Sequence, residues 1–184
     1  SNPLAAERRK LGSVGRASGC EARVVDPQLA PLPEGVTGEI VIRGPNVMRG
    51  YYKNDEATRA AFTPDGWLRS GDLGHRDSDG FFFVTGRIKE LIIKGGENIA
   101  PREIEDLLGS FPEIERAAVI GLPDDRLGER MCACVVLRAG HTLDLETVTS
   151  RFEERGVATY KWPQRLEILD ALPATASGKI QKHV

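Results

Sequence analysis

The sequence has no apolar run that approaches the ~20 residues needed to span a bilayer. Its acidic and basic residues are interspersed, with a formal net charge of −2, so nothing favours nucleic acid or an anionic membrane as a partner. Three cysteines are an odd number for a disulfide framework. Cys132 and Cys134 alternate in the segment MCACVVL and are interpreted as core strand residues. We expect a soluble, cytoplasmic protein.

Several recognisable sites are also missing from the sequence. It contains no GxxxxGK[ST] phosphate loop, no HExxH and no catalytic triad pattern. Its three histidines lie far apart with no second ligand nearby, so no metal site is expected. The 184 residues suffice for one large or two small domains. The sequence has no internal repeat, so a repeat protein is not expected.

Residues 1–86 are expected to form a small, mostly β unit. Residues 21–26 and 38–44 resemble strands and are separated by a proline-rich loop. Residues 54–62 predict a short helix capped by Asn54 or Asp55. The turn DSDG at residues 77–80 predicts a hairpin.

Residues 90–184 are expected to form a compact α+β domain with a three-stranded sheet and helices. A helix that begins at Pro101 has one buried face with the spacing i, i+3, i+4, i+7, formed by Ile104, Leu107, Leu108 and Phe111. Strands are predicted at 114–122, 131–137 and 165–169, and Asp144 is placed to cap a second helix. The predicted fold class is α+β.

The stretch TGRIKELIIKGGENIAPREIE, residues 85–105, joins the two parts. Residues 87–89 are interpreted as a hinge with Lys89 at its centre, because a charged loop residue between domains can absorb a change of backbone angles. Taken alone, Lys89 is more often a solvated loop lysine. Gly95 and Gly96 predict a loop where backbone can approach a ligand without a Cβ in the way.

Three positions have the chemistry of a nucleotide site. Asp72, in GWLRSGDLG, is a carboxylate able to accept two hydrogen bonds from a sugar diol; alone it is more often a turn aspartate. The planar guanidinium of Arg87 suits phosphate or ribose oxygens; alone, it is more often an ion-pair partner at a domain interface. Lys179, in the tail LPATASGKIQKHV, can bring a point charge to a reacting phosphate, although lysines near a terminus are usually just solvated.

Taken together and in this order, the segments GWLRSGDLG, GFFFVTGRIKELIIKGGENIAPREIE and LPATASGKIQK resemble the adenylate-forming superfamily. Its members include acyl-CoA synthetases, luciferases and the adenylation domains of nonribosomal peptide synthetases. The resemblance covers essentially the whole chain. It implies that residues 1–86 are the last β subdomain of the large N-terminal domain. Residues 90–184 would be the mobile C-terminal domain.

The resemblance also implies roles for individual residues. Nucleotide-binding roles fall on Asp72 for the ribose hydroxyls, Arg87 for the nucleotide, Val84 against the adenine and Asn98 near the adenylate. Lys89 matches the hinge, and Gly95, Gly96 and Glu97 belong to the loop that lines the CoA pantetheine tunnel. Lys179 matches the lysine that neutralises charge when the adenylate forms.

The implied reaction has two steps and uses ATP, Mg²⁺ and CoA. A carboxylic acid first attacks ATP to give acyl-AMP and pyrophosphate. The small domain then turns about Lys89, removes Lys179 and brings in the glycine loop for attack by the CoA thiol. The family's phosphate loop and the motif that supplies the Mg²⁺ carboxylate are not in this sequence. We therefore expect this chain alone to be inactive.

The sequence defines less well which thiol accepts the acyl group, CoA or a carrier protein, and which carboxylic acid is activated. KGGENIAPREIE, GLPDDRLGE and YKWPQRLEILDALP are similar to CoA ligases that act on medium-chain, fatty or carbocyclic acids. A carrier-loading adenylation domain or a luciferase-like relative is the alternative. A non-catalytic, partner-binding fragment is a third hypothesis. The sequence indicates neither the acid nor the oligomeric state.

Overall fold

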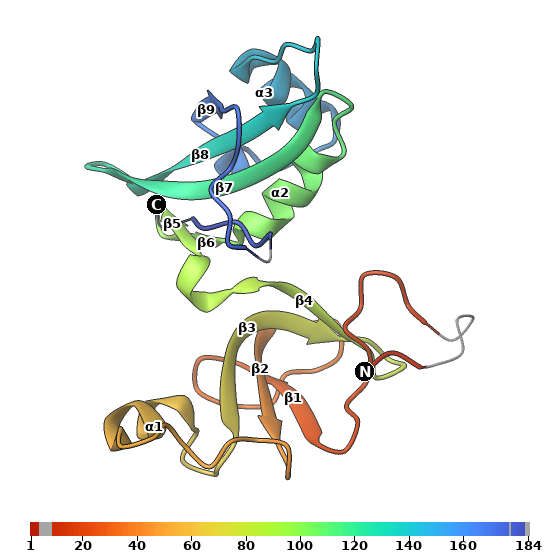
Figure 1. The fold of residues 1–184 in the computed structure, drawn as a ribbon, viewed down its shortest axis with the longest axis vertical. Helices are drawn as coiled ribbons and strands as arrows, with labels where there is room; N and C mark the ends of the chain where they lie inside the picture. Colours follow the sequence, from red (N-terminus) through yellow and green to blue (C-terminus); the bar gives the residue numbers. More distant parts are fainter. Residues whose placement is uncertain (4–8, 177, 183–184) are drawn as a thin grey trace. The chain divides into compact units, whose positions relative to one another are not determined.

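The computed structural model describes residues 1–3, 9–176 and 178–182. Over this part, the chain divides into two compact units, Ser1–Lys89 and Glu90–Val184 (Figure 1). The elements of the first unit are β1 (Glu21–Val25), β2 (Gly38–Arg43), α1 (Asp55–Ala61), β3 (Leu68–Arg76), β4 (Phe82–Arg87) and the start of the 3-10 turn η2 (Ile88–Glu90). Those of the second are β5 (Ile92–Lys94), β6 (Glu97–Ile99), α2 (Pro101–Gly109), β7 (Ile114–Asp124), β8 (Gly128–Leu137), α3 (Leu145–Glu154), the 3-10 turn η3 (Thr159–Lys161) and β9 (Arg165–Ile168).

The first unit is built on an antiparallel sheet. Within the described residues it has four strands in the order β1-β2-β3-β4, each paired with its neighbour in sequence. The predicted hairpin turn between β3 and β4 is confirmed: Asp77 Oδ1 accepts the N–H of Asp79 at 3.0 Å and of Phe81 at 2.8 Å. Asn54 caps α1 as predicted, with its side chain accepting from the N–H of Ala57 at 3.0 Å.

Both faces of this sheet carry a small apolar core. Val24, Ile40 and Phe82 pack together on one face. On the other face, Val25 and Val41 are fully buried against Trp67. Because side chains alternate along a strand, β2 contributes to both cores, which explains its run of three apolar residues.

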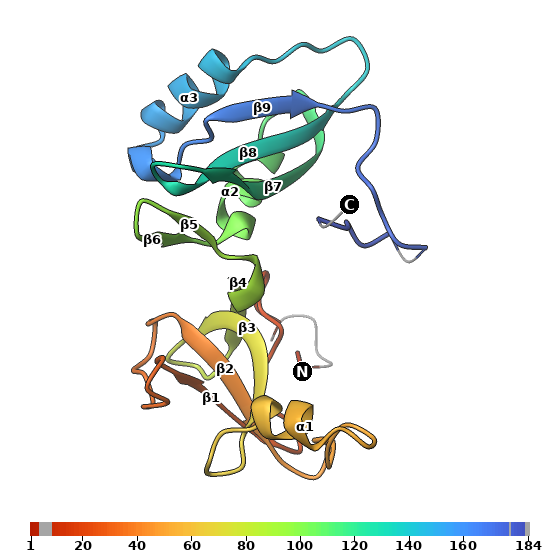
Figure 2. The same cartoon turned by 90° about the vertical axis from the view of Figure 1, so that its left-hand side faces the viewer.

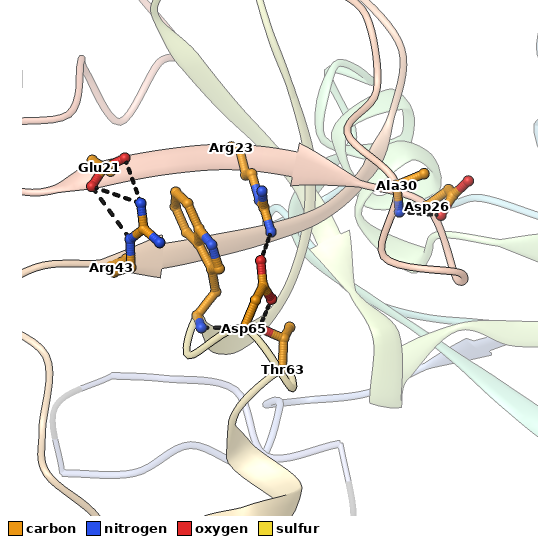
Figure 3. A network of polar contacts seen from close by, with 8 residues as sticks. Glu21, Arg23, Asp26, Ala30, Arg43, Thr63 and Asp65 are labelled. Atoms are coloured by element: carbon orange, nitrogen blue, oxygen red, sulfur yellow. Dashed lines mark hydrogen bonds and ion pairs between the residues drawn. The ribbon is translucent and has the colours of Figure 1, made fainter.

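Charged side chains close the face that carries Trp67 (Figure 3). The guanidinium groups of Arg23 and Arg43 lie 4.1 and 4.4 Å from the indole ring. Each arginine also has an acidic partner, Asp65 at 2.8 Å for Arg23 and Glu21 at 3.1 Å for Arg43. These contacts combine cation–π attraction with ion pairing and keep Trp67 only 5% exposed.

The second unit has a larger sheet than the sequence predicted. Its described residues form five strands rather than three, in the order β6-β5-β8-β7 with β9 beside β8. All neighbours are antiparallel except β8 and β9. The two strands beyond the expected three, β5 and β6, have three residues each and lie on either side of the glycine pair. Three residues are too few to show a strand period.

One core holds the second unit together. Helices α2 and α3 bury Ile104, Leu108, Val148 and Phe152 against the sheet. The ring of Phe152 meets Phe111 edge to face, with centroids 6.2 Å apart. The predicted buried face of the helix that begins at Pro101, α2, is confirmed, except that Leu107 is only partly buried.

Strands β7 and β8 extend beyond their predicted bounds. The ladder continues through the charged segment, with Pro123 opposite Glu129 and Asp124 opposite Gly128. Asp124 Oδ1 accepts the N–H of Arg126 at 3.1 Å and of Leu127 at 3.0 Å. The turn between β7 and β8 is therefore short, and a single carboxylate closes it.

Candidate functional site

Asp72 and Arg87 meet across two strands of the first unit. They are register partners on β3 and β4, and Arg87 Nε lies 3.0 Å from Asp72 Oδ1. The Arg87 side chain is 55% exposed and the Asp72 side chain 29%. The structure thus brings together two residues that the sequence singled out separately. One edge of the pair stays open to solvent.

Val84 lies on the same strand as Arg87. It is half-buried and packs against the core formed by Val24, Ile40 and Phe82. Its partner across the ladder is Gly74. A contact with adenine remains a prediction for the part of the side chain that this core leaves exposed.

The boundary between the two units falls directly after Lys89. Lys89 is exposed and lies in the 3-10 turn η2, between β4 and β5. Its hinge role stays a prediction, because a boundary in one structure records no motion.

Gly95 and Gly96 form a two-residue hairpin between β5 and β6, where the sequence predicted an open loop. Their φ angles are +60° and +89°. Positive φ at both central residues belongs to the tight hairpin turns that glycine favours. The N–H of Gly95 donates to the carbonyl of Leu127 at 2.8 Å. A Cβ on Gly96 would meet nothing within 4 Å, so the hairpin tip is bare.

The residues after the glycine pair are also exposed. Glu97 pairs with Lys94 and Asn98 with Ile93 in the hairpin ladder. Together with the two glycines, Glu97 and Asn98 form a continuous exposed tip, which we call the glycine hairpin (Gly95–Asn98). The candidate CoA-binding residues and Asn98 therefore share one small element.

A buried lysine holds the glycine hairpin, and the sequence reasoning missed it. Lys94 is 8% exposed, and its ammonium donates to the carbonyls of Tyr160 at 2.8 Å and Trp162 at 3.1 Å. Burial lowers the pKa of Lys94 from its ordinary value. In the sequence, a lysine inside an apolar strand beside a glycine pair was the available signal.

Lys179 lies in a tight turn of the C-terminal tail. The N–H of Thr175 donates to the Lys179 carbonyl at 2.8 Å, and the N–H of Lys179 donates to Thr175 Oγ1 at 3.1 Å. Ala174 and Ile180 form a bridge that closes the turn. Within the described part of the chain, the exposed Lys179 ammonium has no ion-pair partner. Ser177, which the sequence analysis quotes in this tail, lies outside the described residues.

Lys182, three positions further on, is held firmly. Its ammonium lies 2.6 Å from Glu105 on α2 and 3.3 Å from Glu90. The side chain is only 16% exposed. Glu105 also accepts the N–H of Val119 at 2.8 Å. The tail thus presents one lysine and fixes the other.

The tail and the glycine hairpin belong to different surfaces. Figure 2 shows the β5–β6 hairpin and the segment after β9 on opposite sides of the second unit. Two candidate groups for successive steps therefore lie on separate faces of one small domain.

Other reactive groups are structural. Cys132 is buried in β8, and burial raises the pKa of its thiol to about 12. Cys132 and Cys134 both lie in β8, as predicted, although Cys134 is only partly buried. Their Sγ atoms are 3.9 Å apart. The described residues contain no group of three or more His, Cys, Asp or Glu side chains able to hold a metal ion. None of the helices that the structure describes is long and apolar enough to cross a membrane.

Two family profiles match the chain. One is described as the AMP-binding enzyme C-terminal domain and matches residues 103–179; the other, AMP-binding enzyme, matches residues 1–52. The solved structure of ATP-bound MatB from Rhodopseudomonas palustris has a TM-score of 0.91 with 38% identity, covering 98% of this chain and 36% of that one. The mixed α+β fold is therefore that of adenylate-forming enzymes.

Curated relatives agree with the profiles. The sulfoacetate–CoA ligase of Cupriavidus necator is 48% identical over 182 residues, which is 99% of this chain and 36% of the relative. The medium-chain fatty-acid–CoA ligase of Escherichia coli is 48% identical over 167 residues, 90% of this chain and 30% of the relative. The chain thus spans about a third of the length of these relatives. It belongs to the AMP-binding, adenylate-forming enzyme family.

Proposed function

We propose that this chain is the C-terminal part of an ATP-dependent acid–CoA ligase that forms AMP. The observation that carries the proposal is that the tail after β9, to which Lys179 belongs, and the β5–β6 hairpin lie on opposite sides of the second unit (Figure 2). A single domain with two such faces suits two successive reactions at one pocket. The CoA ligases among the relatives support the choice of acceptor.

In the first step, the carboxylate of the acid attacks the α-phosphate of ATP and pyrophosphate leaves. Asp72 accepts hydrogen bonds from the ribose hydroxyls, and Arg87 contacts the nucleotide beside it. Lys179 brings its exposed ammonium to the phosphate, where negative charge develops. An ammonium without a competing carboxylate needs to break no ion pair before it acts.

In the second step, the CoA thiol attacks the carbonyl carbon of the acyl-adenylate, a thioester forms and AMP leaves. Rotation about Lys89 exchanges Lys179 for the glycine hairpin. The bare tip at Gly96 leaves room for the pantetheine chain to pass. The buried Lys94 keeps the hairpin rigid beneath it. Asn98 belongs to the same tip, and its proposed role is a polar contact near the adenylate.

Magnesium is expected to accompany ATP, but the part of the chain that the structure describes shows no fitting site for it. Among the described residues, no three acidic, histidine or cysteine side chains gather. We therefore assign no residue of this chain to Mg²⁺ and derive no step through it. By the resemblance, its carboxylate ligand belongs to the N-terminal part of the enzyme.

The test uses the full-length protein that contains this chain, with ATP and a panel of short, medium-chain, aromatic and dicarboxylic acids. AMP and acyl-CoA that form only with both an acid and CoA would support the proposal. Transfer to a phosphopantetheinyl carrier protein but not to CoA would favour a carrier-loading adenylation domain instead. Absence of pyrophosphate release with every acid would favour a non-catalytic fragment.

The 184-residue chain by itself is proposed to be inactive, since the acid pocket and the phosphate loop of the family are not in its sequence. Pyrophosphate release by the purified chain, with ATP and any acid of the panel, would contradict this. The purified full-length protein is the positive control.

A further inference from the structure

Glu39 is a buried glutamate that the proposed mechanism does not use. It lies on β2, and its side chain is 7% exposed. Oε2 accepts from Arg69 Nε at 3.0 Å and Nη2 at 2.7 Å, and Oε1 accepts the backbone N–H of Gly71 at 3.2 Å. Both oxygens are engaged, so the cost of burying the charge is offset by three donors.

The N–H that Glu39 binds belongs to a β-bulge. Between β2 and β3, Val41 pairs with Arg69 but Glu39 pairs with Leu73. One residue of β2, Ile40, therefore faces three residues of β3, 70–72. Backbone groups in such a bulge cannot all join the ladder, and bulges commonly re-aim a side chain beside an active site.

Side chains replace the missing ladder bonds of the bulge. Glu39 takes the N–H of Gly71, whose φ is +71°. The N–H of Asp72 donates to Ser70 Oγ at 3.0 Å, and that hydroxyl donates to the carbonyl of Ile40 at 2.6 Å. The backbone on the N-terminal side of Asp72 is therefore set by polar side chains.

A second irregularity follows one residue after Asp72, because the β3–β4 register shifts between Leu73 and Gly74. Asp72 is thus the last residue of the first bulge, and only Leu73 separates it from the second irregularity. There it faces Arg87, with 3.0 Å between Nε and Oδ1. The direction of its carboxylate depends on how the preceding bulge is held.

We propose that Glu39 is a positioning residue for Asp72: it holds the bulge at Gly71 so that the Asp72 carboxylate presents both oxygens to a ribose diol. The inference rests on the proposed function, which assigns Asp72 to the ribose. The inference adds Glu39, a residue of β2, to the nucleotide site, although Glu39 itself touches no substrate. A residue that acts in this way affects recognition of the ribose rather than ATP use in general.

The test compares ATP with 3′-deoxy-ATP as substrates for pyrophosphate release by the full-length protein. The preference is the ratio of kcat/KM for the two nucleotides. Asp72→Ala is expected to bring the ratio close to one. Glu39→Gln has a single acceptor oxygen for the donors of Arg69 and Gly71, so one donor loses its partner and the ratio falls about tenfold.

Two further variants test whether Glu39 acts through Asp72. Asp72→Ala combined with Glu39→Gln should have the same ratio as Asp72→Ala alone, because Glu39 acts only through Asp72. Glu34→Gln is the matched control: Glu34 pairs with Arg76 at 3.3 Å in the same unit, outside the bulge. The control should keep the full preference for ATP.

The outcomes separate the two proposals. If Asp72→Ala keeps the preference, the ribose role fails and the inference falls with it. If Asp72→Ala loses it and Glu39→Gln keeps it, the inference alone is overturned. If the Glu39→Gln protein does not fold, Glu39→Asp replaces it, because aspartate keeps the negative charge on a shorter side chain. Loss of the preference for ATP over 3′-deoxy-ATP in Glu39→Asp supports the positioning role of Glu39. If neither variant folds, Glu39 stabilises the sheet and the inference is overturned.

Discussion

The two units hold their candidate residues in different ways. In the first, Asp72 is fixed by a cross-strand ion pair with Arg87 and by a bulge whose N–H groups bind side chains. In the second, Gly96 and Lys179 lie exposed on tight turns. The backbone of these turns is hydrogen-bonded, but Lys179 has no ion-pair partner within the described part of the chain.

The difference indicates what each unit contributes. A side chain that is already ordered loses little conformational entropy when a ligand binds, so a fixed carboxylate suits recognition. An exposed group on a rigid turn suits delivery to a site and removal from it. We expect substitutions in the first unit to change nucleotide affinity. Those in the second should change one reaction step and spare the other.

The largest effect is expected for Lys179→Ala in the full-length protein. Loss of a group that stabilises developing charge should slow pyrophosphate release by roughly 10²–10³-fold. Thioester formation from supplied acyl-adenylate should stay near the wild-type rate, and this second half-reaction is the internal control. Single-turnover assays measure both steps. An equal loss in both would remove the contrast between the two faces.

Gly96→Leu is expected to have the opposite pattern. The bulky side chain should slow CoA turnover by roughly 10²-fold through misplacement of the thiol, and leave adenylation nearly intact. Gly140→Leu is the matched control, because Gly140 has a φ of +79° and Gly96 +89°, and a Cβ on either meets nothing within 4 Å. Both variants carry similar backbone strain. If CoA turnover survives in Gly96→Leu, or falls equally in the control, the tunnel assignment is wrong.

Arg87→Lys should have a smaller effect, confined to the nucleotide. The KM for ATP is expected to rise about tenfold, since a lysine cannot reproduce the planar fork. The unfolding midpoint should barely move, because exposed ion pairs contribute only ~0–1 kcal/mol and the Arg87 side chain is 55% exposed. Initial rates and thermal unfolding test this. Lower stability with an unchanged KM would make the pair purely structural.

The smallest effect concerns acid stability of the second unit. The hydrogen bonds from Arg151 lower the pKa of Glu113 from 4.5 to about 2. Ionised Glu113 therefore stabilises the fold above its unfolded pKa, and this contribution is lost as pH falls from roughly 5 towards 2. Urea midpoints of the 184-residue chain should depend less on pH in Glu113→Gln. Glu115→Gln, which lacks an ion pair among the described residues, should behave like the wild type; equal slopes in all three would contradict this.

Much of the fold follows from local sequence signals. Asn54 and Asp144 were predicted as helix caps, and each accepts a backbone N–H of the first turn. The Pro101 helix has its expected buried face because the apolar spacing matches one side of a helix. These features depend on residues close in sequence.

Very short elements and features that depend on distant residues were not predicted. β6 exists because three residues fold back across the glycine pair, and its period is too short to detect. The burial of Lys94 requires carbonyls of Tyr160 and Trp162, more than sixty residues away. Glu39 has the alternation of a solvent-facing strand residue, yet a bulge on the next strand buries it. The sequence singled out each candidate residue separately, but not the buried side chains, such as Lys94 and Glu39, that hold the surrounding backbone.

Under the proposed function, in which the glycine hairpin meets the acceptor thiol, the short connection between β5 and β6 restricts which changes could alter the choice of acceptor. One inserted residue would shift the pairing of Ile92 with Ile99, and both side chains are nearly fully buried. In a strand, a shift by one position turns a side chain to the opposite face. Libraries aimed at new thiol or amine acceptors should therefore keep this length and vary only the side chains of Glu97 and Asn98.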